Sequence, residues 1–263
     1  MLSKLLKYEL KNTFKFLVIF YTLSLLFAGL TRILGDAANS TFVLVLAEIF
    51  KGASISMMCS TLINNSMRIW VMFKGSLYGD ESYLTHTLPV KKSTIYLSKI
   101  LNSAITLIVS FIVIISSFLI IFYSDAFVEM LKGLLLNLSQ GADVSIWGFA
   151  ALFLGILYFE FLNLIQCGFS GIIVGHRFNS GKNLISVLLG LAFYTVSQSL
   201  VLIPVLLAGI FNSDIIKLFT SNIIPNIELF TTMLIISALS YFAICIILSI
   251  VNIMFFKKGV NVD

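Results

Sequence analysis

Long apolar runs alternate with shorter polar segments along the whole chain. About six of the runs reach the length of roughly 20 mainly apolar residues that a helix needs to cross a bilayer. These runs predict spanning helices over residues 16–34, 43–63, 100–123, 146–174, 184–211 and 229–256. We therefore expect an all-α polytopic membrane protein, with residues 1–263 forming a single transmembrane domain.

The second run is the least regular of the six. Glu48 and Lys51 lie in its first half, and the apolar sequence resumes at Trp70, so the span can sit lower than residues 43–63. The two charges are three residues apart on a helix, where opposite charges meet side by side. We expect them to form a structural ion pair near the end of the span.

The composition agrees with a membrane protein and excludes an ordinary soluble domain. Hydrophobic residues make up 59% of the chain, charged residues 11%, and the mean hydropathy is +1.05. The formal net charge of +5 comes without a long basic run or an RNA-binding aromatic pattern, so nucleic acid is not an expected partner. Instead, the basic residues identify one side of the membrane.

Lysine and arginine gather in the N-terminal segment, in the loops after the second and fourth spans, and in the tail. The opposite loops hold only Arg32, Lys132 and Lys217. Because basic residues favour the cytoplasmic side, we expect a multi-pass protein of the plasma membrane with both termini in the cytoplasm.

The first 15 residues have the pattern of an amphipathic helix lying in the membrane interface. At 100° per residue, four leucines fall on one side and four lysines on the other. These interfacial lysines are Lys4, Lys7, Lys11 and Lys15. They would face anionic lipid or a protein partner.

Motifs for catalysis are missing. The nearest phosphate-loop candidate, "GHRFNSGKN" at residues 175–183, has the wrong glycine spacing and Asn183 in place of Ser or Thr. HExxH and GxSxG are absent, and Cys59, Cys167 and Cys245 look like isolated buried residues. We expect no enzyme activity, no catalytic residue, no metal site and no cofactor in this chain.

The fourth span carries a polar stripe. Glu160, Asn163 and Gln166 fall on roughly one face, which must contact protein or water because a charge in lipid is costly. The stripe either lines a pathway, with a proton-sensitive Glu160, or forms hydrogen bonds between helices. Gly171 and Gly175 form a GxxxG motif further along the same run, which allows another helix to approach closely.

The most polar segment, residues 78–99, lies between the second and third spans. With its flanks it reads "RIWVMFKGSLYGDESYLTHTLPVKKSTIYLSKIL" and resembles the signature of bacterial ABC-2 type transporter permeases, the six-span membrane subunits of ABC exporters. The matching residues are Asp80, Glu81, Tyr83, Leu84, Thr85, Thr87, Leu88, Pro89, Val90, Ser98 and Lys99. Ser82 replaces the glycine that is common before the tyrosine. The resemblance extends more loosely to "LLKYELK" and to "GHRFNSGKN".

The resemblance implies a cytoplasmic coupling helix within residues 78–92, which docks on a separate ATP-binding subunit. The docking residues would be Asp80, Glu81, Tyr83, Leu84, Thr85, Leu88 and Pro89. The partner would hold ATP and Mg²⁺, and a second permease subunit, identical or homologous, would complete the transporter. The cargo would be an amphiphilic peptide, an antibiotic or a lipid-like molecule. The alternative interpretation of this segment is a cytoplasmic loop whose charges keep it in water and which has no docking role.

Two other functions fit the sequence. One is an ion-coupled secondary transporter that uses Glu160 and needs no ATPase. The other is a membrane component that transports nothing, such as an anchor or an immunity subunit of a partner complex.

Overall fold

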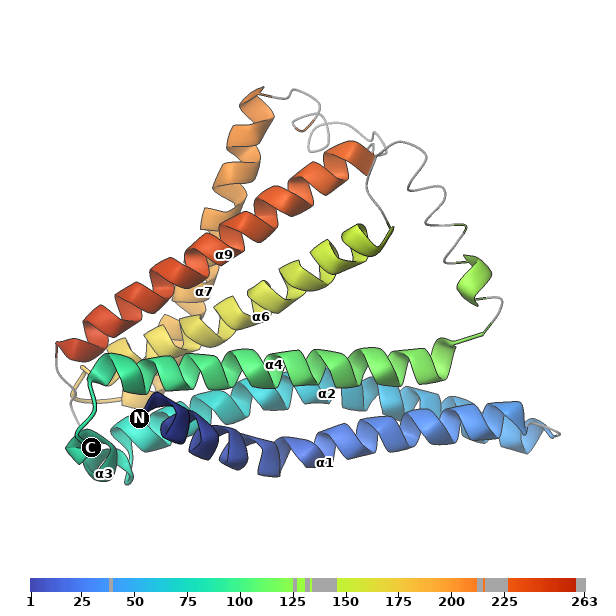
Figure 1. Cartoon of the computed structure of the whole chain (residues 1–263), viewed down its shortest axis with the longest axis horizontal. Coiled ribbons are helices and arrows are strands. Elements are labelled where there is room, and N and C mark those ends of the chain that lie inside the picture. The colour runs from blue at the N-terminus through green and yellow to red at the C-terminus, as the bar shows by residue number, and fades with distance from the viewer. Residues whose placement is uncertain are drawn as a thin grey trace. The chain divides into compact units, whose positions relative to one another are not determined.

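The computed structural model describes residues 1–37, 40–124, 127–130, 133, 146–211, 215 and 227–258 (Figure 1). Helices are the only regular elements within these ranges. They are α1 (Leu2–Asp36), α2 (Thr41–Tyr78), α3 (Ser82–Thr87), α4 (Lys92–Phe122), α6 (Ile146–Gly175), α7 (Lys182–Phe211) and α9 (Ile227–Lys257). All except the short α3 are long and apolar enough to cross a membrane, so the chain is a multi-pass membrane protein.

Several helices extend past the predicted spans into polar sequence. α1 runs without a break through the predicted interfacial segment and the first span, α2 continues to Tyr78, and α4 begins at Lys92. Apolar runs mark only the part of a helix that suits lipid, whereas backbone hydrogen bonding continues through polar residues. Lys132 and Lys217 lie outside the described residues.

The chain divides into two compact units. The single transmembrane domain stays a prediction. Unit 1 comprises Met1–Ser76 and Tyr83–Glu129, and unit 2 comprises Leu77–Ser82 and Met130–Asp263. The end of α2, the turn after it and Ser82 therefore belong to unit 2, while the rest of α3 belongs to unit 1.

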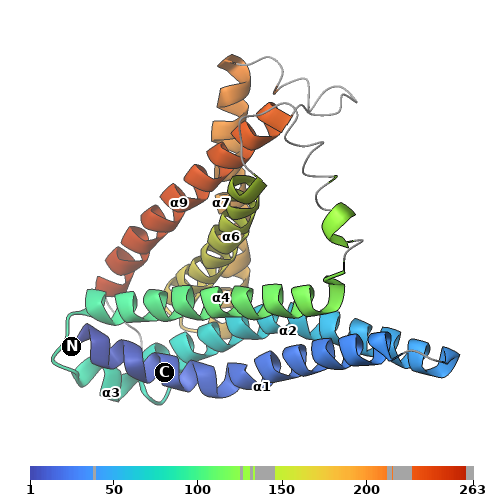
Figure 2. The same cartoon turned by 45° about the vertical axis from the view of Figure 1, so that its right-hand side comes forward.

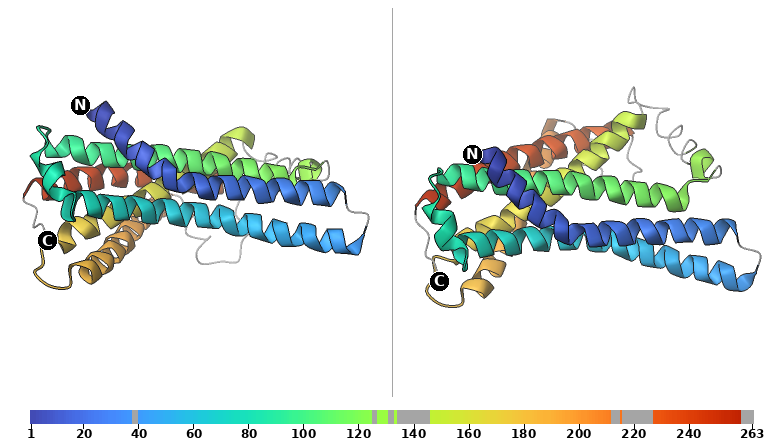
Figure 3. Two further views of the ribbon diagram at one scale, coloured as in Figure 1. Left: turned by 90° about the horizontal axis from the view of Figure 1, so that it is seen from below. Right: turned by 60° about the horizontal axis from the view of Figure 1, so that its bottom comes forward.

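In unit 1 the helices α1, α2 and α4 run side by side (Figures 1 and 3). α1 turns a narrow stripe of mostly small and polar residues inward, spaced by three or four residues. The buried members are Glu9, Thr13, Leu17, Tyr21, Ser24, Ala28 and Thr31. Such a stripe suits a membrane, where close backbone approach and hydrogen bonds hold helices together because lipid leaves no hydrophobic force between them.

Hydrogen bonds between side chains join the three helices of unit 1. The Tyr21 and Ser110 hydroxyls lie 2.9 Å apart, and the Asn65 amide donates to the Ser110 hydroxyl at 3.0 Å. Further along, the hydroxyls of Ser24 and Ser117 also lie 2.9 Å apart. All of these residues are buried, so α1, α2 and α4 share one polar seam.

Unit 2 contains α6, α7 and α9 (Figures 1 and 2), and the ring centroids of Phe149 on α6 and Phe230 on α9 lie 6.0 Å apart. α6 and α7 approach closely where the chain passes from one to the other. A Cβ atom on Gly171 would lie 2.7 Å from Cα of Gly190, and one on Gly175 would lie 2.6 Å from Cα of Ser186. The close approach expected of the GxxxG motif is confirmed.

The structure also tests the expected ion pair on α2 and the expected burial of the three cysteines. Lys51 and Glu48 form the expected ion pair, with 3.2 Å between the ammonium nitrogen and a carboxylate oxygen. Cys167 and Cys245 are buried, but the expectation of burial is wrong for Cys59, which is exposed on α2. An apolar run shows that a residue suits lipid, not that another helix covers it.

Candidate functional site

The predicted coupling segment is a short helix between two irregular stretches. α2 ends at Tyr78, a turn follows, α3 spans Ser82–Thr87, and residues 88–91 are not helical. Pro89 has no backbone N–H and disfavours helical geometry at Leu88, which accounts for the end of α3 at Thr87. The Ser82 backbone N–H donates to the carbonyl of Gly79 at 2.9 Å and closes the turn before α3.

The surface of this segment is apolar at its centre. Tyr83 is 68% exposed and Leu84 is 74% exposed, although both belong to a helix outside the six candidate spans. Of the other docking candidates, Asp80, Glu81, Leu88 and Pro89 are exposed and Thr85 is half-buried. An exposed leucine in a spanning helix can face lipid, but α3 has six residues and is not among the candidate spans.

The first end of the segment is held by a buried ring contact in unit 2. Tyr78 is 1% exposed, and its ring centroid lies 4.4 Å from that of His176. His176 directly follows α6, and its Nδ1 lies 2.9 Å from the carbonyl oxygen of Ile172 and 3.4 Å from the Ser186 hydroxyl. The loop "GHRFNSGKN" thus contributes a buried histidine that packs on the end of α2.

The helix that follows the segment, α4, is held by a buried ion pair in unit 1. The Lys99 ammonium donates to the Glu9 carboxylate and, at 2.6 Å, to the Ser76 hydroxyl. Lys99 and Glu9 are 4% and 9% exposed. This pair joins the "SK" motif at the start of α4 to "LLKYELK" in α1, two stretches that carry the sequence resemblance.

Sequence reasoning gave no role to Glu9. The available signal was its position: it is the one acid among the N-terminal lysines and shares a helix face with Thr13 and Leu17. A carboxylate on the buried face of α1 requires a cationic partner, but no local pattern shows that the partner is Lys99, 90 residues away.

The N-terminal lysines and leucines have the relative positions that the amphipathic pattern predicts. Lys4, Lys7, Lys11 and Lys15 are all exposed, whereas Leu2, Leu5, Leu6 and Leu10 are half-buried. Contact with lipid stays a prediction.

The polar stripe of α6 is directed toward α7 and α9 within unit 2. Asn163 is fully buried and accepts a hydrogen bond from Ser197 at 2.8 Å, and Gln166 donates to Ser249 at 3.1 Å. Glu160 is half-buried and accepts from the Tyr194 hydroxyl at 3.4 Å. These contacts are bonds between helices, and a pathway-lining role for the stripe stays a prediction.

The described ranges give no candidate metal site. No group of three or more His, Cys, Asp or Glu side chains there could hold a metal ion. Two exposed features of unit 1 stand out: the apolar side chains of α3 and the lysines at the start of α1.

Comparison with protein-family models, with curated proteins and with solved structures finds no match to this chain.

Proposed function

We propose that the chain is the membrane subunit of an ATP-driven bacterial exporter of the ABC-2 type, and that α3 docks on a separate ATP-binding subunit. The observation that carries the proposal is the exposure of Tyr83 and Leu84 on a helix outside the spans. Side chains of this size on an aqueous surface are typical of a protein interface. The resemblance of residues 68–101 to such permeases supplies the class of partner.

The helices before and after the segment are each held by a buried contact, and through them docking would act on the spans. Tyr78 is the last residue of α2 and Lys99 lies in the second turn of α4, and both are buried. A partner that pulls on α3 would therefore displace two long helices and not merely a loose loop. Asp80 and Glu81, exposed just before α3, would meet basic groups on the partner.

The complete transporter would contain two permease subunits and two ATP-binding subunits in the plasma membrane. The partner subunits would hold ATP and Mg²⁺, and this chain would neither bind nor hydrolyse nucleotide. Both termini and α3 would lie in the cytoplasm, where the ATPase is. The proposed cargo, an amphiphilic peptide, antibiotic or lipid-like molecule, rests on the resemblance alone.

Ion-coupled transport through Glu160 is the second candidate, since this carboxylate is half-buried in an apolar helix beside Tyr194. Its neighbours Asn163 and Gln166 are engaged in bonds between helices, which favours a packing role for the stripe. A transporter of this kind would need no ATPase.

The test is co-purification with an ATP-binding protein that carries a Walker A motif and is encoded beside this chain. Leu84→Asp/Leu88→Asp should abolish co-purification and ATP-dependent transport, because charges replace the apolar contact of the interface. Expression and thermal unfolding should be unchanged, since Leu84 and Leu88 are exposed.

Phe178→Asp is the matched control. Phe178 is 48% exposed in the loop between α6 and α7, so the change removes a similar apolar side chain and adds the same charge outside α3. It should leave the complex intact. A double variant that still binds the ATPase and transports normally would overturn the proposal, as would transport that proceeds with no ATPase.

A further inference from the structure

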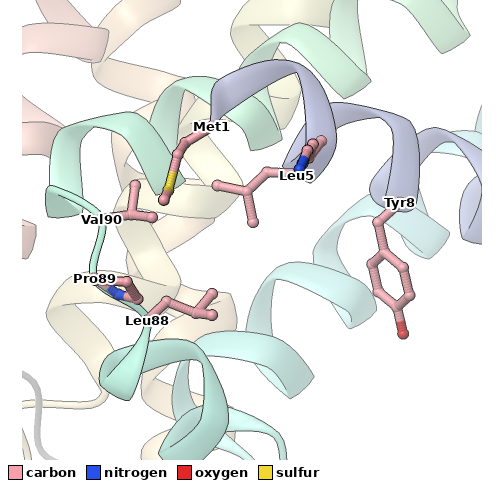
Figure 4. A pocket seen from close by; sticks show the side chains of 7 residues that line it. Met1, Leu5, Tyr8, Leu88, Pro89 and Val90 are labelled. Carbon is pink, nitrogen blue, oxygen red and sulfur yellow. The ribbon is translucent and has the colours of Figure 1, made fainter.

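A pocket of about 370 Å³ lies in unit 1 between the first turns of α1 and the irregular stretch after α3. Its lining is mostly apolar and comes from Met1, Lys4, Leu5, Tyr8, Leu88, Pro89 and Val90. In Figure 4, Met1 and Leu5 extend from α1 toward Leu88, Pro89 and Val90, and Tyr8 lies at one side. The pocket therefore has an apolar floor made by two separate parts of the chain.

The dimensions of α1 place this pocket at the level of the lipid headgroups. α1 has 35 residues and is about 52 Å long, whereas the hydrocarbon core is about 30 Å thick. The lysine-bearing end is the part that extends beyond the core, because lysine in the core is costly. Residues 88–91 also indicate a position outside the hydrocarbon core, because they are not helical and non-helical backbone is not stable against lipid chains.

Charge around the pocket has one sign. Lys4 lines it, Lys7 follows one turn along α1, and Lys91 follows Val90; all three are exposed. No acidic side chain is among the described lining residues, and the nearby Glu9 is buried against Lys99. An apolar floor with a cationic rim complements a molecule that joins a hydrocarbon chain to an anionic group.

We propose that this pocket binds an anionic phospholipid from the membrane interface, with the phosphate against Lys4 and the apolar part next to the headgroup against Leu5 and Val90. The volume is near the lower end of small-molecule sites, so it would enclose only part of the lipid while the acyl chains stay in the bilayer. The inference does not depend on the ATPase. It makes the N-terminal helix a specific lipid contact and not only an electrostatic anchor.

Native mass spectrometry of the full chain in detergent, titrated with phosphatidylglycerol or phosphatidylcholine, tests the proposal. The wild type should bind phosphatidylglycerol more tightly. Lys4→Gln should weaken that binding about fivefold, as expected for one lysine near a lipid surface, and should weaken phosphatidylcholine binding less, because the choline cation already offsets the phosphate charge. Val90→Asp, which places a charge on the apolar floor, should weaken the binding of both lipids.

Lys15→Gln is the control, because it removes the same charge from the same exposed face but does not line the pocket. A bound lipid predicts a loss for Lys4→Gln and almost none for Lys15→Gln. Equal losses would show diffuse attraction and overturn the proposal. So would unchanged lipid binding by Lys4→Gln together with weaker ATPase co-purification, which would make the pocket a protein contact.

Discussion

At the scale of single residues, the most consequential contact is the pair of Glu9 and Lys99. Two charges removed from water each lose several kcal/mol of solvation, and their attraction repays this only while both are present and hydrogen-bonded. Ser76 supplies a further bond to the Lys99 ammonium at 2.6 Å. The pair therefore fixes α4 against α1 next to the segment that we propose as the docking element.

Breaking the pair on one side should cost more than removing it. Lys99→Met should lower the free energy of unfolding by about 3–5 kcal/mol, because it leaves the Glu9 carboxylate buried without its cation. The double variant Glu9→Leu/Lys99→Met should recover most of that loss. Unfolding in mixed detergent micelles measures both effects, and simply additive losses in the double variant would show that the two charges are not coupled.

At the scale of elements, the contact of α6 with α7 depends on missing side chains. Gly171 and Gly175 are one turn apart on α6, and Ser186 and Gly190 are one turn apart on α7. The backbones meet so closely that a Cβ on Gly171 would lie 2.5 Å from the Gly190 backbone nitrogen. Only a shift of a whole helix would make room for it.

Gly171→Ala should therefore destabilise unit 2 by about 1–3 kcal/mol, the usual cost of overpacking. Gly155→Ala is the control on the same helix, because a Cβ there meets nothing within 4 Å. It should be neutral or slightly stabilising, since alanine favours a helix over glycine. Thermal unfolding of the two purified variants gives the comparison, and equal midpoints would contradict the close approach.

At the scale of the whole molecule, the described residues contain six helices long and apolar enough to span a membrane. Six spans would place both termini on the same side. The distribution of Lys and Arg predicts that this side is the cytoplasm. The proposed function requires the same orientation, because α3 must reach a cytoplasmic ATPase.

Cysteine labelling tests this orientation. In a variant with the three native cysteines replaced, Thr87→Cys and Phe178→Cys should react with an impermeant maleimide only in inside-out vesicles. Ser40→Cys, in the opposite loop, should react only from the outside of intact cells. All three positions are exposed, so access to the thiol depends on the side of the membrane. Labelling of Thr87→Cys in intact cells would contradict both the topology and the docking proposal.

The sequence alone determined the class of fold and the place of each span. Whether a helix can enter lipid depends on the residues of that helix, so local apolar runs were enough to predict six spans. The same holds for the Glu48 and Lys51 pair and for the close approach at Gly171, where spacing along one helix carries the signal. The ends of the helices were less predictable, because α2 and α4 continue through polar residues that no longer face lipid.

Only the tertiary structure decided which polar residues meet. Glu9 and Lys99 are far apart in sequence, as are Tyr78 and His176, and no local pattern pairs them. The division into two units and the pocket beside Leu88 also depend on distant segments. The physical reason is that lipid affinity belongs to each helix, whereas hydrogen bonds and ion pairs between helices depend on which faces pack together.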